Sequence, residues 1–329
     1  MTPARAHLTR DDLTPLARAA LGRRPTAVTR LRGGSRKGVY RLALDDDTTA
    51  IAYVWSPEED YWGGPEPDLR DTFAHASGID LFLAAHQRLT GLGVRVPRLL
   101  FADEDAVHLP AATAVVEDVR GGSLERLLRD DPAAARVPLA RLAGMLGALR
   151  ECTSAGHGKA ALVERGGTAY GGSCEQAVAD RAVRDVAAAA ERDPRVRAAR
   201  RALTERVREL RAAVAPRART SLVHGELGPD HVLVTHDGDP ALIDIEGLMY
   251  FDAEWEHAFL ELRFGPAYDV LRTAGLDQDR MALYRLAMHL GLVAGPLRLL
   301  DGDFPERQVM LDIAEFNLRR ALDLLRTAS

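Results

Sequence analysis

The fold of this chain is decided by residues 221–247, SLVHGELGPDHVLVTHDGDPALIDIEG. Two short apolar runs, Val232–Thr235 and Ala241–Ile243, flank a turn that reads HDGDP. Apolar runs of this kind form β-strands, and an Asp-Gly pair between them is typical of a β-hairpin. The segment therefore predicts a short hairpin with polar residues at its open end.

Three side chains that can ionise or bind a metal ion are expected at the open end of this hairpin. Strand pairing brings His231, where the first strand begins, opposite Asp244, where the second strand ends. The loop that starts at His224 leads into the same end and presents Glu226. A convergence of ionisable and metal-capable groups is typical of a phosphoryl-transfer site. The simpler interpretation is an ordinary hairpin whose polar ends are solvated.

The rest of the chain predicts strands first and helices afterwards. A hairpin is expected at Val39–Leu44 and Thr49–Trp55, and a Pro-, Gly- and acid-rich stretch predicts a loop at Glu58–Gly78. This order indicates an α+β protein with a small β-rich N-terminal lobe, residues 1–118, and a larger, mainly helical C-terminal lobe, residues 119–329. Helices are expected at Asp11–Leu21, Ile79–Leu92, Leu124–Leu128, Leu139–Glu151, 176–215 and Gln308–Leu325, and further strands at 95–103 and 113–119.

The composition argues against several classes of protein. The 329 residues carry a net charge of −5, so the chain lacks the excess positive charge that is typical of nucleic-acid-binding proteins. The two cysteines, Cys152 and Cys174, have neither metal-ligand spacing nor the pattern of a disulfide framework. The N-terminal residues lack the apolar stretch of a signal peptide, and the apolar runs are too short to span a bilayer. A cytoplasmic protein with no nucleic-acid or membrane partner is expected.

The hairpin segment resembles the catalytic region of aminoglycoside phosphotransferases and related small-molecule kinases. Their loop reads His-Gly-Asp, four residues and Asn, followed by a strand that ends in Ile-Asp. This chain has His224-Gly225-Glu226, four residues and His231, and its second strand ends in Ile243-Asp244 without a gap in register. The order of the other pieces also fits, with a nucleotide-covering loop at 33–42, a connection at 92–100 and an interlobe hinge at 115–124.

The resemblance implies a two-lobed, protein-kinase-like fold and assigns roles to site residues. Glu226, with His224 beside it, would orient or deprotonate the acceptor hydroxyl. Asp244 would hold Mg²⁺ on the phosphates of ATP or GTP, and His231 stands at the position of a second metal ligand. The residues implied in nucleotide binding are Gly33, Gly34, Ser35, Lys37, Glu117 and Val119, the last two through their backbone. The acids implied near the substrate are Glu246, Asp312 and Glu315.

Several positions depart from the family pattern. Glu226 keeps a carboxylate but extends it by one methylene, and Glu256 is lengthened in the same way where the family has a supporting Asp. The loop is therefore expected to have shifted as a unit. His231 offers nitrogen where Mg²⁺ prefers oxygen ligands. The second metal ion is then missing or altered, or His231 contacts phosphate, or it only supports the loop through a hydrogen bond.

The residue that supplies the phosphate-binding cation in the family is also replaced in this chain. Alignment of the third strand puts Tyr53 where a Lys or Arg belongs, and the chain has only two lysines, Lys37 and Lys159. We expect Lys37, in the glycine-rich turn, to reach the phosphates instead, with Asp80 as a candidate acidic partner. The alternative is a solvated turn formed by Arg36 and Lys37.

The predicted function is transfer of phosphate from ATP or GTP to a hydroxyl of a small molecule. By resemblance, the acceptor is an aminoglycoside, another antibiotic or a biosynthetic intermediate. Two alternatives remain. The departures at Tyr53, Glu226 and His231 would also suit a pseudokinase that binds a nucleotide or metabolite without turnover. The same fold could transfer AMP in place of phosphate.

Overall fold

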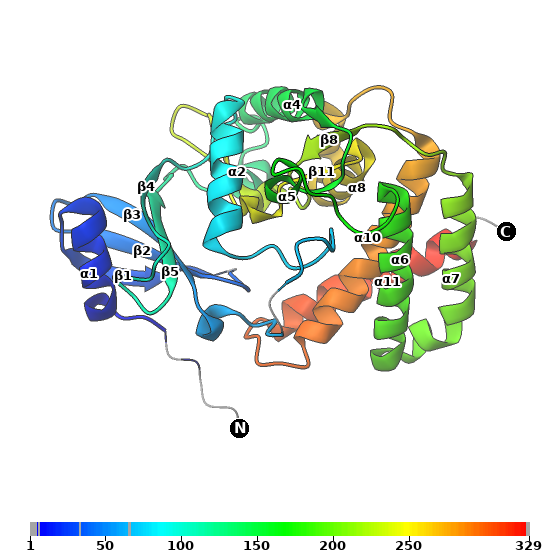
Figure 1. The fold of residues 1–329 in the computed structure, drawn as a ribbon, viewed down its shortest axis with the longest axis horizontal. Coiled ribbons are helices and arrows are strands. Elements are labelled where there is room, and N and C mark those ends of the chain that lie inside the picture. The colour runs from blue at the N-terminus through cyan, green and yellow to red at the C-terminus, as the bar shows by residue number, and fades with distance from the viewer. Residues whose placement is uncertain (1–4, 6, 33, 65–66, 327–329) are drawn as a thin grey trace. The chain divides into compact units, whose positions relative to one another are not determined.

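The computed structural model describes residues 5, 7–32, 34–64 and 67–326. The chain forms two compact units, which are considered separately (Figure 1). The first unit contains Met1–Glu66, His75–Met145 and Pro229–Gly247, and the second contains Pro67–Ala74, Leu146–Gly228 and Leu248–Ser329. The lobe boundary expected near residue 118 stays a prediction.

The first unit is built on a five-stranded antiparallel sheet with strand order β1-β2-β3-β5-β4. Residues of β2 alternate between buried and half-buried, which is the two-residue period of a strand with one face on the core. The core on that face includes Tyr40, Leu42 and Val115. The strands are β1 (Pro25–Arg30), β2 (Gly38–Leu44), β3 (Thr49–Trp55), β4 (Leu99–Asp103) and β5 (Ala112–Glu117).

Helix α1 (Arg10–Leu21) packs against this sheet (Figure 1). Its start is a capping box in which Thr9 and Asp12 bond each other's backbone N–H groups. Leu13 and Leu16 are buried one turn apart and complete the core of the sheet. Strand β1 was not expected from the sequence, because this edge strand carries no continuous apolar run.

The predicted hairpin is confirmed as β9 (Val232–Val234) and β10 (Pro240–Leu242), an antiparallel pair in the first unit. Gly238 supplies the positive φ, +75°, that the turn requires. Short 3₁₀ turns precede and follow the hairpin at η2 (Pro229–His231) and η3 (Ile245–Gly247). The remaining helices of this unit are α2 (Ile79–Gly91) and α3 (Leu124–Asp130), with the turn η1 (Pro57–Glu59) after β3.

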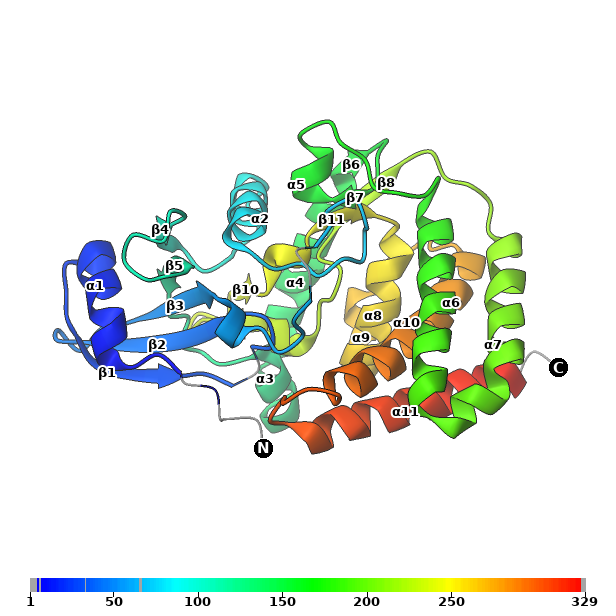
Figure 2. The same ribbon diagram turned by 60° about the horizontal axis from the view of Figure 1, so that its bottom comes forward.

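The second unit is mainly helical. Helices α6 (Cys174–Arg192) and α7 (Pro194–Ala213) lie side by side, and α10 (Gln278–Leu299) and α11 (Arg307–Arg326) complete the bundle (Figure 2). The arginine-rich stretch expected at 176–215 is thus two helices, because Asp193 caps a new helix and Pro194 occupies its first turn. The core between these helices is apolar, and Val186, Leu203 and Leu290 are fully or almost fully buried in it.

A small four-stranded sheet with order β6-β8-β11-β7 lies in the same unit. Its strands are β6 (Thr153–Ser154), β7 (Gly158–Lys159), β8 (Thr220–Val223) and β11 (Met249–Phe251). The other helices are α4 (Arg136–Glu151), which continues from the first unit, α5 (Ala160–Val163), α8 (Ala253–Phe264) and α9 (Tyr268–Leu271), with the turn η4 (Gly265–Ala267). Among the described residues, no helix combines the length and the apolar character needed to cross a bilayer.

Candidate active site

Lys37 is the centre of a buried charge cluster in the first unit. Its Nζ donates a hydrogen bond of 2.9 Å to Asp244 Oδ1 and a second hydrogen bond to Glu246 Oε1. Lys37 is 8% exposed and Glu246 is 4% exposed, whereas the Asp244 side chain is 51% exposed. The structure thus joins the glycine-rich turn to the end of the hairpin through one ammonium group.

The charge on Lys37 is stable in this environment. Burial lowers the pKa of Lys37, but the nearby carboxylates of Asp244 and Glu246 outweigh burial and hold that pKa above its ordinary value. Nearby opposite charges favour the charged form of a buried group, so Lys37 carries its proton near neutral pH. The partners are therefore Asp244 and Glu246, while Asp80 is exposed at the start of α2.

Tyr53 occupies the position on β3 where the resemblance places a cation. The Lys37 ammonium lies 5.2 Å from the centroid of its ring, within the range of a cation–π interaction. Burial raises the pKa of Tyr53 to about 12, so the phenol is neutral. Trp55 and Phe82 both pack edge-on against the same ring, and they contact each other in a tilted arrangement. The lysine of the turn therefore stands over the residue that replaces the strand cation.

The glycine-rich turn is fixed by the segment that follows β3. Gly33 lies outside the described residues, and Gly34 admits no side chain, because a Cβ would lie 2.4 Å from the carbonyl oxygen of Lys37. Ser35 accepts hydrogen bonds from the backbone N–H of Tyr61, at 2.9 Å, and from Trp62 Nε1, at 3.1 Å. These bonds hold the turn that presents Lys37 in one conformation.

His231 and Asp244 meet at the open end of the hairpin. The backbone N–H of Ile243 donates to the His231 carbonyl, so His231 pairs with Ile243 and its ring lies next to Asp244. The distance from His231 Nε2 to Asp244 Oδ2 is 3.8 Å. Asp244 has a positive φ of 58°, a conformation that is uncommon for a residue with a side chain and is frequent at functional sites.

The donor set suits Mg²⁺ only in part. Within the part of the chain that the structure describes, no group of three or more His, Cys, Asp or Glu side chains is placed to hold a metal ion. Mg²⁺ commonly uses one or two carboxylates together with substrate phosphates and water. The half-exposed carboxylate of Asp244 fits that requirement, whereas the imidazole of His231 is a poor ligand for it.

The proposed catalytic loop begins in the second unit. Strand β8 leads directly into His224, which is 1% exposed, and Gly225 turns the chain with φ at +98°. Glu226 follows with an exposed side chain. The chain then passes from the second unit to the first between Gly228 and Pro229.

Glu256 anchors this loop from the first turn of α8. Its Oε2 accepts a hydrogen bond of 2.8 Å from the backbone N–H of Gly225, and the N–H groups of His224 and Leu227 also point to this carboxyl group. Burial raises the pKa of Glu256 to about 7, although these N–H groups act in the opposite direction. Trp255 Nε1 donates a further hydrogen bond of 3.0 Å to the Gly225 carbonyl.

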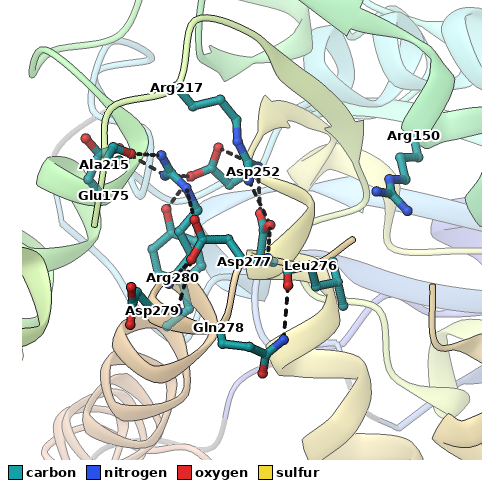
Figure 3. Close-up of polar contacts among 12 residues, drawn as sticks. Arg150, Glu175, Ala215, Arg217, Asp252, Leu276, Asp277, Gln278, Asp279 and Arg280 are labelled. Carbon is teal, nitrogen blue, oxygen red and sulfur yellow. Dashed lines mark hydrogen bonds and ion pairs between the residues drawn. The ribbon is translucent and has the colours of Figure 1, made fainter. Parts of the chain in front are cut away.

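A buried ion-pair network supports the start of α8 (Figure 3). Arg280 Nη1 donates to Asp252, the residue before the helix, and lies 3.2 Å from Glu175. Arg217 forms two hydrogen bonds of 2.7 and 2.8 Å with Glu254. The sequence did not predict this network, since Arg280 comes from α10 and its partners are distant in the chain. The network fixes the turn of α8 that carries Trp255 and Glu256.

Four further predicted residues lie at the expected hinge and on helix α11. At the expected hinge the backbone N–H of Glu117 donates to the Arg98 carbonyl, at 2.9 Å, and Val119 is 6% exposed. On α11, Glu315 pairs with Arg195 at 2.8 Å, and Asp312 accepts a hydrogen bond from the neighbouring Gln308. Their roles toward a nucleotide or substrate stay predictions.

Comparison with known proteins identifies the family. A family model described as the phosphotransferase enzyme family matches residues 28–286, which is more than half of the chain. A search of curated protein sequences gives no match. Among solved structures, a spectinomycin phosphotransferase in complex with ADP and spectinomycin is similar, with 11% identity, a TM-score of 0.67, and coverage of 97% of this chain and 98% of that chain.

Two further structures have the same fold at low identity. An aminoglycoside phosphotransferase in complex with GDP and kanamycin has 17% identity and a TM-score of 0.63, and the match covers 95% of this chain and 98% of that one. The choline kinase LicA from Streptococcus pneumoniae has 13% identity and a TM-score of 0.62, with coverage of 97% and 99%. The predicted α+β, protein-kinase-like fold is confirmed, and by the match of the family model the chain belongs to the phosphotransferase enzyme family.

Proposed function

We propose that this protein transfers the terminal phosphate of ATP or GTP to a hydroxyl group of a small molecule. The observation that carries the proposal is the contact of Lys37 with Asp244 above the ring of Tyr53. A buried lysine in contact with the aspartate that follows the hairpin is expected where a cation and a metal-binding carboxylate both act on the triphosphate of a nucleotide. The family supports a small-molecule phosphotransferase as the broad class.

In this proposal Lys37, Asp244 and His231 act on the nucleotide. Lys37 exchanges part of its contact with Asp244 and Glu246 for phosphate oxygens and neutralises their charge. Asp244 holds Mg²⁺, which supplies additional positive charge to the phosphates. His231 donates a hydrogen bond to phosphate or to Asp244, in keeping with its nitrogen donor.

In the same proposal Glu226 acts on the acceptor. Glu226 orients the acceptor hydroxyl and takes up its proton, and the hydrogen bonds from the loop to Glu256 and Trp255 keep Glu226 in place. Glu226 in the loop and its anchor Glu256 on α8 are each one methylene longer than the acids of the family pattern, in keeping with a loop that has shifted as a unit. Similar structures that hold spectinomycin or kanamycin support a hydroxylated acceptor. The similar choline kinase indicates that the acceptor need not be an antibiotic.

The experiment is transfer of labelled γ-phosphate to a panel of hydroxylated small molecules. The wild-type protein is expected to label at least one acceptor, and Glu226→Gln is expected to lower the rate by about 10²-fold or more, because proton acceptance typically contributes that much. Glu104→Gln, at an exposed glutamate, is the matched control. The mass of the product separates phosphate transfer from AMP transfer.

The second candidate is a nucleotide-binding module without turnover, which the tyrosine at position 53 favours. Such a module would bind ATP or GTP, yet no acceptor would be labelled and Glu226→Gln would change nothing. Labelling of an acceptor that depends on Glu226 would exclude it.

A further inference from the structure

Lys159, the second of the two lysines, lies beside the catalytic loop in the second unit. It ends the short strand β7 and pairs with Met249 of β11, which pairs in turn with Val223 of β8. Directly paired residues of antiparallel strands project to the same face, and neighbouring strands are about 4.8 Å apart. The lysine therefore shares a face with Val223, the residue directly before His224.

Lys159 is buried without a direct ion pair. It is 5% exposed, and none of the residues that the structure describes forms a hydrogen bond or an ion pair with its ammonium. Lys37, buried to a similar extent, has two carboxylates. Burial of an unpaired charge is costly, and proteins retain such groups at functional sites. The structural role of a lysine does not explain this arrangement, since an apolar residue would fill the position at lower cost.

Charged groups from three other segments surround Lys159. Glu226 of the catalytic loop and Asp71 of the 67–74 segment are close enough to raise its pKa, and Arg181 of α6 lowers it. Burial is the largest influence, and the result is a pKa of about 8 for Lys159. Arg181 is engaged elsewhere, with Asp185 at 3.4 Å and the ring of Phe73 at 4.5 Å. Lys159 is thus a buried cation near Glu226 that none of the described residues engages in an ion pair.

We propose that Lys159 is a catalytic residue that binds the phosphoryl group while this group is transferred to the acceptor. The inference rests on the proposed function and adds a cation on the acceptor side. The acceptor oxygen bonds to the γ-phosphorus, and the bond from this phosphorus to the bridging oxygen breaks. The electron pair leaves with the nucleoside diphosphate, and the hydroxyl proton goes to Glu226. Lys159 keeps its own proton and donates hydrogen bonds to the phosphoryl oxygens, which carry the charge of the transition state.

The first test uses the presence of only two lysines in the chain. Lysine labelled with ¹³C at the ε-carbon gives two side-chain resonances, and Lys159→Met assigns them. Inorganic phosphate is the probe, since it resembles the transferred group. We expect phosphate to raise the pKa of Lys159 from about 8, because an anion stabilises the ammonium form, and to leave the Lys37 resonance without titration. A Lys159 titration that is identical with and without phosphate would overturn the inference.

The second test separates a catalytic from a structural role. Lys159→Met is expected to leave the protein at least as stable toward unfolding near pH 7, because it removes a buried unpaired charge, and to leave nucleotide affinity unchanged. Turnover of the labelled acceptor is expected to fall about a hundredfold, the usual loss for one transition-state donor. Lys159→Arg, which keeps the positive charge, is expected to lose less of this turnover than Lys159→Met. Loss of stability with unchanged turnover would show a structural lysine.

The outcomes also distinguish this inference from the proposed function. If nucleotide binds and an acceptor is labelled, but phosphate leaves Lys159 unaffected, only the role of Lys159 is wrong. If no nucleotide binds, the proposed function fails, and the phosphate titration still decides whether Lys159 belongs to an anion site.

Discussion

Lys37 is the residue on which the proposed nucleotide site depends. Lys37→Met is expected to weaken ATP or GTP binding strongly and to lower the free energy of unfolding by about 3 kcal/mol, because Glu246 stays buried without its partner. The double variant Lys37→Met with Glu246→Gln removes both buried charges and should recover stability without recovering binding. Calorimetric titration and urea unfolding measure the two effects. Unchanged nucleotide affinity in the single variant would contradict the role of Lys37.

Glu256 is expected to make the free energy of unfolding depend on pH. Its folded-state pKa is raised from 4.5 to about 7, so the native state binds a proton more tightly than the unfolded chain. The contribution to stability is therefore fully present below pH 4.5 and is lost as pH rises to about 7. In Glu256→Gln, which keeps an acceptor for the N–H of Gly225, this dependence should disappear. Urea unfolding across this pH range tests it, with exposed Glu104→Gln as control; an equal slope in wild type and variant would contradict the assignment.

At the scale of elements, the boundary between α6 and α7 depends on Asp193. Its carboxylate accepts the backbone N–H of Arg195 at 2.7 Å and caps the new helix. Asp193→Ala is expected to cost about 1 kcal/mol of stability, typical for loss of an N-cap. Asp105→Ala, at an exposed aspartate, serves as the control in thermal unfolding. Equal midpoints for the two variants would show that the cap is not needed.

Local signals in the sequence predicted some elements and missed others for physical reasons. The hairpin β9–β10 was predicted because its strands and its Asp-Gly turn are adjacent in the chain. Helix α10 was missed, because its buried residues, such as Leu283, Met288 and Val293, point in different directions around the helix and leave no clear polar face. Strand β7 has two residues and is defined only by its pairing with β11.

At the scale of the whole molecule, the two lysines illustrate what the sequence could and could not reveal. Lys37 was predicted as a site residue from the order of motifs, since its turn precedes the strand that lacks the usual cation, and the structure shows its contacts with Asp244 and Glu246. Lys159 carried no motif, and its proximity to Glu226 arises from pairing of residues far apart in the chain. The Arg280 network that supports α8 was hidden for the same reason. The chain thus has one buried lysine in each unit, and both lie next to proposed site residues.

The most direct test of the central claim is thermal unfolding with ATP or GTP and Mg²⁺, for wild type and Asp244→Ala. Asp244 is half-exposed, so the variant should fold. We expect the wild-type midpoint to rise, by the equivalent of about 2.7 kcal/mol at a hundredfold excess of nucleotide over its dissociation constant, and the rise to be lost in the variant. No rise with either nucleotide, or an equal rise in the variant, would contradict a nucleotide site at Asp244.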